Sequence, residues 1–307
     1  MHKKATLVAA VLIVLALFLA VPAWPGTIPA SLVPEGARWI AHLDMEKFVA
    51  TDLYGYLEKD GKFQIKSGDL NRWVKIDVPR DIKGVTVFGL GPGDDEIVFA
   101  VAGKFDKTQL LSLIKLDEDH KEAPYGAYAL HSMGDDGFGA FLTDDLLVFS
   151  EGRAAIEKVL DAAGGKAKSF AGTKLAASLR EVPAGAFLSG FVEDLSGLGK
   201  EINQSKLIEK ASGLFFLAQE KQSRLQFRLQ MNADTPENAK NIADLVQGVM
   251  ALGRMSGGEG DMAGIATLVD GIQVKLDGKT VRLEFDGASQ DVAKLLSSRR
   301  GFPHLLD

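Results

Sequence analysis

The chain has 307 residues, of which 46% are hydrophobic and 25% charged, a composition typical of a globular protein with a buried core. Its formal charge of −6 argues against a nucleic-acid partner, because such proteins carry a clustered basic face. The sequence contains no cysteine, which excludes disulfides, thiolate zinc sites and cysteine nucleophiles.

Residues 1–24 predict a signal peptide or an N-terminal membrane anchor. Lys3 and Lys4 precede an unbroken apolar run, and Val21-Pro22-Ala23 offers small residues for cleavage after Ala23. The apolar run also approaches the ~20 residues that span a bilayer, so residues 5–23 could stay as an inner-membrane anchor. Residues 25–33, rich in proline and glycine, read as a linker. Whether the segment is a cleaved signal peptide or an uncleaved anchor, we expect the rest of the chain to be exported, to the periplasm or the extracellular space.

The first half, residues 34–170, alternates strands and helices. Its expected elements in order are a strand at 39–44, a helix at 45–57, a hairpin of 85–90 and 97–103, a helix opened by Asp106, strands at 125–131, 138–142 and 146–149, and a helix with Ile156, Val159 and Leu160 on one face. Gly164-Gly165 is a typical end for that last helix.

The second half, residues 171–307, has a similar order. We expect a strand at 186–192, a helix at 195–210, a hairpin of 213–218 and 224–231, a helix opened by Thr235-Pro236, a hairpin of 272–276 and 281–285 with an Asp277-Gly278 turn, and a helix capped by Ser289. Gln226, Arg228 and Gln230 alternate with apolar residues, which predicts one solvent face and one buried face.

The segment Val33-Pro34-Glu35-Gly36-Ala37 returns as Val182-Pro183-Ala184-Gly185-Ala186, each time before an apolar strand that ends in an acid. We therefore predict an α+β fold of two tandem repeats. Each repeat has the order strand-helix-hairpin-helix-hairpin-helix, with mostly antiparallel sheets and helices packed on one face.

Three features carry a resemblance. They are an export signal before a strand that ends in Asp44, the segment from Lys75 to Ile82 just before Val85-Thr86-Val87-Phe88, and the tandem β-β-α plan. Together they resemble a loose group of uncharacterised secreted or periplasmic bacterial proteins with duplicated α+β domains. That resemblance implies a compartment and an architecture, and it transfers no functional residues.

His42, Asp44 and Asp194 are the candidate binding residues. His42 and Asp44 lie two apart on a strand and share one face, as a metal or acid–base pair would. The alternative is a locally hydrogen-bonded histidine and an Asp44 that caps the next helix. Asp194 holds the position in the second half that Asp44 holds in the first. The sequence indicates no metal site, cofactor or catalytic set.

The function that we expect is a non-enzymatic binding or scaffold module in the cell envelope, whose partner is an unknown envelope protein or small ligand. The membrane would be involved only through the N-terminal segment, if that segment is uncleaved. Two alternatives stay open: a carboxylate-dependent hydrolase that uses Asp44 and Asp194, and a carrier of a hydrophobic ligand.

Overall fold

A computed structural model of the chain describes residues 30–60, 76–91, 93–134, 137–173, 176, 182–193, 211–255 and 269–298. The expected signal peptide or anchor (1–24), most of the linker, the expected helix at 195–210 and Asp194 lie outside these residues. Within them, no helix has the length and apolar character needed to cross a membrane.

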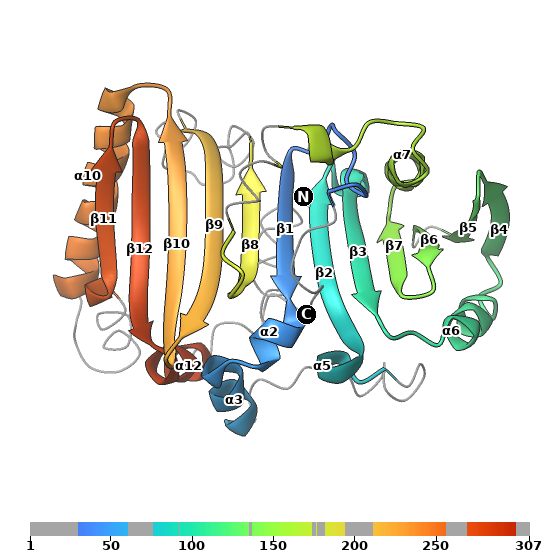
Figure 1. Ribbon diagram of the computed structural model, residues 1–307, viewed down its shortest axis with the longest axis horizontal. Helices are drawn as coiled ribbons and strands as arrows, with labels where there is room; N and C mark the ends of the chain where they lie inside the picture. Colours follow the sequence, from blue (N-terminus) through green and yellow to red (C-terminus); the bar gives the residue numbers. More distant parts are fainter. Residues whose placement is uncertain are drawn as a thin grey trace. The chain divides into compact units, whose positions relative to one another are not determined.

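The chain divides into two compact units, which we describe separately (Figure 1). The described residues of the first lie within 2–48 and 65–184, and those of the second within 49–64 and 185–307. We call them the seven-strand unit and the five-strand unit.

The seven-strand unit is an antiparallel sheet in the order β1-β2-β3-β7-β6-β5-β4. Its strands are β1 (Trp39–Asp44), β2 (Ile82–Gly89), β3 (Ile97–Gly103), β4 (His120–Tyr125), β5 (Tyr128–Met133), β6 (Phe138–Thr143) and β7 (Leu146–Ser150). Its helices are α2 (Met45–Val49), α5 (Val78–Asp81), α6 (Lys107–Ile114) and α7 (Arg153–Ala163), with 3-10 turns η1 (Asp94–Glu96) and η2 (Phe170–Gly172).

Helix α7 covers one face of this sheet. It packs against β3, β6 and β7, and its Ile156, Val159 and Leu160 are buried as the spacing predicts. The chain leaves the helix through Gly164 and Gly165, and Gly165 takes a φ of +73°, which glycine adopts without strain.

The five-strand unit is an antiparallel sheet in the order β11-β12-β10-β9-β8. Its strands are β8 (Ala186–Val192), β9 (Ala211–Lys221), β10 (Arg224–Ala233), β11 (Ile272–Asp277) and β12 (Thr280–Ala288). Its helices are α3 (Asp52–Lys59), α10 (Pro236–Met255) and α12 (Ser289–Ser298).

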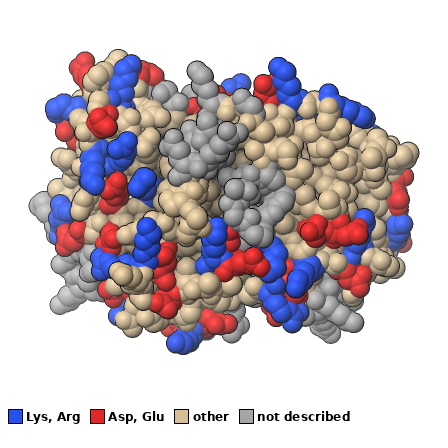
Figure 2. Space-filling view, viewed as in Figure 1, with Lys and Arg blue, Asp and Glu red and all other residues tan. Residues whose placement is uncertain are grey.

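The two faces of this second sheet differ as the period of two predicts. Helix α10 runs beside β11 at the left edge of Figure 1, packs against β10, β11 and β12, and buries Ala239, Ile242 and Ala243 against Val281. On the other face Arg228 pairs with Glu284 across the strands, and charged side chains gather over β10, β11 and β12 in Figure 2. Arg228 is exposed as predicted, whereas Gln226 and Gln230 are half-buried and hydrogen-bonded to neighbouring side chains.

The predicted fold of two tandem strand-helix-hairpin-helix-hairpin-helix repeats is wrong. The described residues are dominated by antiparallel sheet, with twelve strands divided unequally between the units. Five strands follow the same order in both units, β1-β2-β3-β7-β6 in one and β8-β9-β10-β12-β11 in the other. The seven-strand unit has β4 and β5 as an additional hairpin. The helices also differ, because α3 follows β1 in the chain yet packs against α12 in the five-strand unit.

Local chemistry explains where the predicted elements fail. The expected helix over 45–57 is two helices, since Thr51 caps a new start by accepting the N–H of Tyr54 at 3.0 Å. The expected strand at 125–131 is a hairpin, because Gly126 turns the chain with a φ of +61°. The last turn is Gly278-Lys279 rather than Asp277-Gly278, since Asp277 pairs with Thr280.

Candidate functional site

His42 and Asp44 lie on β1 and are almost fully buried, with 5% and 2% of their surface exposed. The strand register places His42 opposite Thr86 on β2, and the imidazole Nδ1 and the Thr86 hydroxyl share a hydrogen bond of 2.9 Å. The carboxylate of Asp44 accepts the backbone N–H of Lys47 at 3.0 Å and pairs with its ammonium group at 2.8 Å. Asp44 therefore caps α2, and both side chains make the local contacts of the structural alternative.

The described residues do not bring His42 and Asp44 together with other ligands. Among the residues that the structure describes, no three His, Asp or Glu side chains form a group ready to hold a metal ion. Asp194, the third candidate, lies outside those residues.

A different surface of the seven-strand unit is unusual. On β3 and β7, every second side chain is apolar and stays partly exposed to solvent. We define the apolar face by these residues: Ile97, Phe99, Val101, Leu147 and Phe149. Val98, Ala100 and Val148 alternate with them and are buried, at most 2% exposed, on the side that α7 covers. Both faces of these strands are thus apolar, although helix α7 covers only one.

The strand register sets the arrangement of the apolar face. Phe99 lies opposite Phe149, and Val101 lies opposite Leu147. The rings of Phe99 and Phe149 stack with centroids 4.9 Å apart and planes 5° from parallel. Such a pair contributes about 0.5–1.5 kcal/mol beyond the burial of its area.

Part of this face is covered from within the same unit. Ile97, Phe99 and Val101 pack against a buried cluster made of Ile76, Val78, Ile82, Val85 and Val87. Phe149 nevertheless keeps 37% of its surface exposed. An antiparallel sheet with one solvent face normally places polar residues there, as β10 and β12 do. Contiguous exposed apolar side chains instead mark a contact site.

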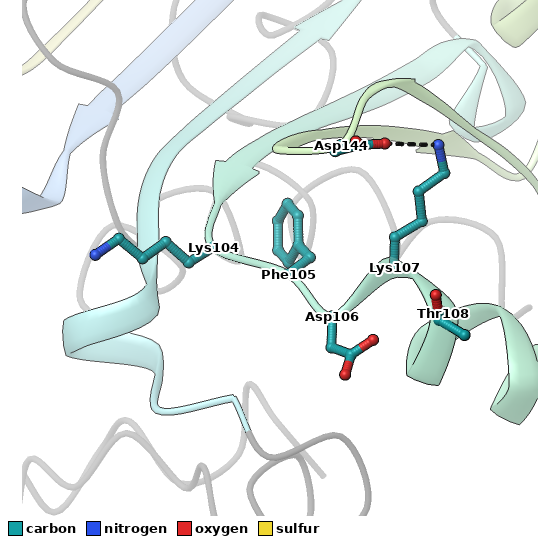
Figure 3. Close-up of a pocket in the computed structure, with 6 residues that line it drawn as sticks. All are labelled: Lys104, Phe105, Asp106, Lys107, Thr108 and Asp144. Atoms are coloured by element: carbon teal, nitrogen blue, oxygen red, sulfur yellow. Dashed lines mark hydrogen bonds and ion pairs between the residues drawn. The ribbon is translucent and has the colours of Figure 1, made fainter.

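An open pocket of about 610 Å³ lies at the end of this face (Figure 3). It is lined by Lys104, Phe105, Asp106, Lys107, Thr108 and Asp144. Phe105 meets Phe141 edge to face, with centroids 6.3 Å apart, and Phe141 lies opposite Leu147 of the apolar face. The pocket therefore continues the apolar face through these two rings.

Charged groups line the pocket on the side of α6. The ammonium group of Lys107 lies 5.3 Å above the centre of the Phe141 ring and 3.0 Å from the Asp144 carboxylate, toward which it points in Figure 3. Asp106 caps α6 by accepting the N–H of Gln109 at 2.9 Å. Lys107 and Asp144 are thus paired with each other, and Asp106 is engaged with α6, beside the aromatic ring of Phe105.

Helix α6 adds apolar surface beside the pocket. Its residues 107–114 are all described, and none of them is fully buried, although Leu110, Leu111, Leu113 and Ile114 are apolar. Leu116, just after its end, is 78% exposed.

The sequence carries a signal for the apolar face that does not take the form of a motif. In the segments Ile97 to Ala102 and Leu146 to Phe149, consecutive residues are apolar, so the side chains on both faces of the strand are apolar. In an antiparallel strand this pattern requires cover on both faces or leaves one apolar face in contact with solvent.

Comparison with known proteins gives a fold and no family. No protein-family model matches the chain, and no curated protein matches it. Solved structures of TP0453 are similar: crystal form III has 10% sequence identity and a TM-score of 0.54 over 89% of this chain and 99% of that one. Crystal form I has 9% identity and a TM-score of 0.52, again over 89% of this chain and over 97% of its own. At these identities the likeness concerns the fold alone.

Proposed function

We propose that this protein is an exported cell-envelope protein that acts as a non-enzymatic binding or scaffold module, with the apolar face as its contact surface. One observation carries the proposal. Ile97, Phe99, Val101, Leu147 and Phe149 form a run of partly exposed apolar side chains across two neighbouring strands.

The partner that suits this surface is a protein with an apolar patch of its own. Full burial of an exposed Phe side chain is worth about 1.5–3 kcal/mol, and Phe149, with 37% of its surface exposed, would gain roughly a third of that on contact with a partner. The ion pair of Lys107 with Asp144 supplies a polar rim at one end. An apolar centre with a polar rim is the usual anatomy of a protein–protein interface.

The competing enzyme hypothesis has less support from the described geometry. A carboxylate-dependent hydrolase needs Asp44 as an acid or a base, but both of its oxygens are engaged with Lys47. The apolar face instead favours binding over bond cleavage.

Export is supported by the sequence of residues 1–24. A fusion of residues 1–40 to an alkaline phosphatase that is active only outside the cytoplasm tests it, with Lys3→Glu and Lys4→Glu as the matched variant. We expect activity from the native fusion and a clear loss from the variant, since the positive start directs translocation. An inactive native fusion would refute export.

The contact surface can be tested by site-specific photo-crosslinking in the cells that make the protein. A benzoylphenylalanine probe replaces Phe149 or, separately, Ile97, and the control probe replaces Leu276, which is apolar and 48% exposed in the five-strand unit. We expect both test positions to give the same protein adduct by mass spectrometry and the control to give none.

Two outcomes would overturn the proposal. If Phe149, Ile97 and Leu276 give the same adducts, the apolar face is not a specific contact surface. If the test positions give lipid adducts alone, the protein-binding function fails and the hydrophobic-ligand carrier takes its place.

A further inference from the structure

The hairpin of β4 and β5 gathers three side chains that commonly bind metal ions. His120 and Glu122 are two apart on β4, so they share a face of the strand. The register places His131 of β5 directly opposite Glu122, which brings it to the same face. None of the three belongs to the apolar face or to the pocket beside it.

The facing ring nitrogens of His120 and His131 are about as far apart as two ligands of one zinc ion. His120 Nε2 and His131 Nδ1 are 3.2 Å apart, and the ring centroids are separated by 5.5 Å. With zinc–nitrogen bonds of 2.0–2.1 Å, two ligands of a tetrahedral zinc ion lie roughly 3.3 Å from each other. The two nitrogens now share a hydrogen bond, so one of them carries a proton. With the ring protons on His120 Nδ1 and His131 Nε2, a small movement of the rings would allow both nitrogens to bind one ion.

Glu122 can supply a third ligand. Its carboxylate lies 3.0 Å from the Lys115 ammonium, and both side chains are largely exposed, at 44% and 51%. Exposed ion pairs of this kind contribute little to stability, so a metal ion can displace Lys115 at small cost. His120, Glu122 and His131 do not form a complete ligand set in the part of the chain that the structure describes, so the site requires Glu122 to exchange Lys115 for the ion.

The local charges also suit a cation. Asp117 and Asp119 lie just before His120 and add negative potential nearby.

We propose that His120 Nε2, His131 Nδ1 and the carboxylate of Glu122 bind one divalent transition-metal ion, with zinc as the favoured ion. Imidazole with carboxylate is a donor set for zinc and copper, whereas magnesium and calcium prefer oxygen ligands alone. The proposal is independent of the contact surface, because the binding of an ion to the purified protein requires no partner.

Calorimetric titration of ZnCl₂ into the purified full chain tests the site at pH 7.5. We expect one equivalent of zinc to bind, with at least about tenfold weaker binding for His120→Gln and for Glu122→Gln. Lys115→Met should bind zinc more tightly, because it releases Glu122. His304→Gln, which removes a histidine far from the hairpin in sequence, is the control and should bind zinc as the native chain does.

Electron paramagnetic resonance of the Cu²⁺-loaded chain gives a second readout. We expect the signature of two nitrogen ligands in the native chain and of one in His120→Gln, with circular dichroism to verify that the variant is folded. Three results would overturn the proposal: a folded native chain that binds no zinc, a His120→Gln variant that binds zinc as tightly as the native chain, or equal affinity for zinc and magnesium.

Discussion

Glu220 on β9 accepts the backbone N–H of Leu53 at 2.9 Å, although the two residues are 167 positions apart in the chain. The second carboxylate oxygen accepts the N–H of Asp52 at 2.7 Å, and the hydroxyl of Ser289 donates to Glu220 at 2.6 Å. One carboxylate thus serves the first turns of α3 and α12. A negative charge at two helix N-termini also interacts favourably with both helix dipoles.

Replacing Glu220 should destabilise the five-strand unit. Glu220→Gln removes the charge and one acceptor, and we expect a loss of about 1–3 kcal/mol in the free energy of unfolding, measured with urea. Glu237→Gln is the matched control, because Glu237 is an exposed acid in the first turn of α10. If both variants unfold at the same urea concentration, Glu220 does not hold the two helices.

The contact between Glu220 and Leu53 also shows what sequence patterns could and could not predict. Local patterns correctly placed the alternating strand around Arg228, the start of α10 at Pro236 and the helix that begins at Ser289. No local pattern states which sheet a helix will cover. The amphipathic stretch of α3 fits either half, and a carboxylate far along the chain decides its location.

The turn between β9 and β10 carries a second testable feature. Gln222 and Ser223 have φ angles of 52° and 60°, a left-handed conformation that costs roughly 1–2 kcal/mol per residue for most side chains. Asn tolerates this region better, so Gln222→Asn should stabilise the protein by about 0.5–1 kcal/mol, seen as a melting temperature higher by a few degrees.

A control for this turn lies in the neighbouring hairpin. Lys279 follows Gly278 in the turn between β11 and β12, but it does not share the positive φ of Gln222. Lys279→Asn should therefore leave the melting temperature unchanged. A Gln222→Asn variant that melts at or below the native temperature would contradict the argument from backbone strain.

The candidate site was predicted only in part, for physical reasons. The sequence placed His42 and Asp44 on one strand face and offered Asp44 as a cap of the next helix, as the structure has them, but the pattern could not identify Thr86 as the partner of His42. The hairpin with His120 and His131 was missed, because its first strand is polar and follows an acidic run that reads as a turn.

Removing the partner of His42 should be costly. Thr86 is 1% exposed, and Thr86→Val deletes the hydroxyl that bonds to the imidazole while preserving the shape of the side chain. We expect a loss of about 1–3 kcal/mol in the free energy of unfolding, since a buried polar group loses a partner. Thr108→Val, at an exposed position, should change it by less than about 0.5 kcal/mol. Equal stability of the two variants would argue against a structural role for this bond.

The stability of the seven-strand unit should depend on pH through His131. Desolvation lowers the pKa of its imidazole from the usual 6.5, with smaller effects from His120, Lys115 and Lys107, while Glu122 opposes the change. The unfolded chain then binds a proton more readily than the folded one, so stability is complete above about pH 6.5 and falls as the pH decreases through that value. Chemical unfolding from pH 8 to 5, with a chelator to remove metal ions, should show this decline in the native chain and a shallower one in His131→Gln. His304→Gln should keep the native slope, and a native slope in His131→Gln would place the titrating group elsewhere.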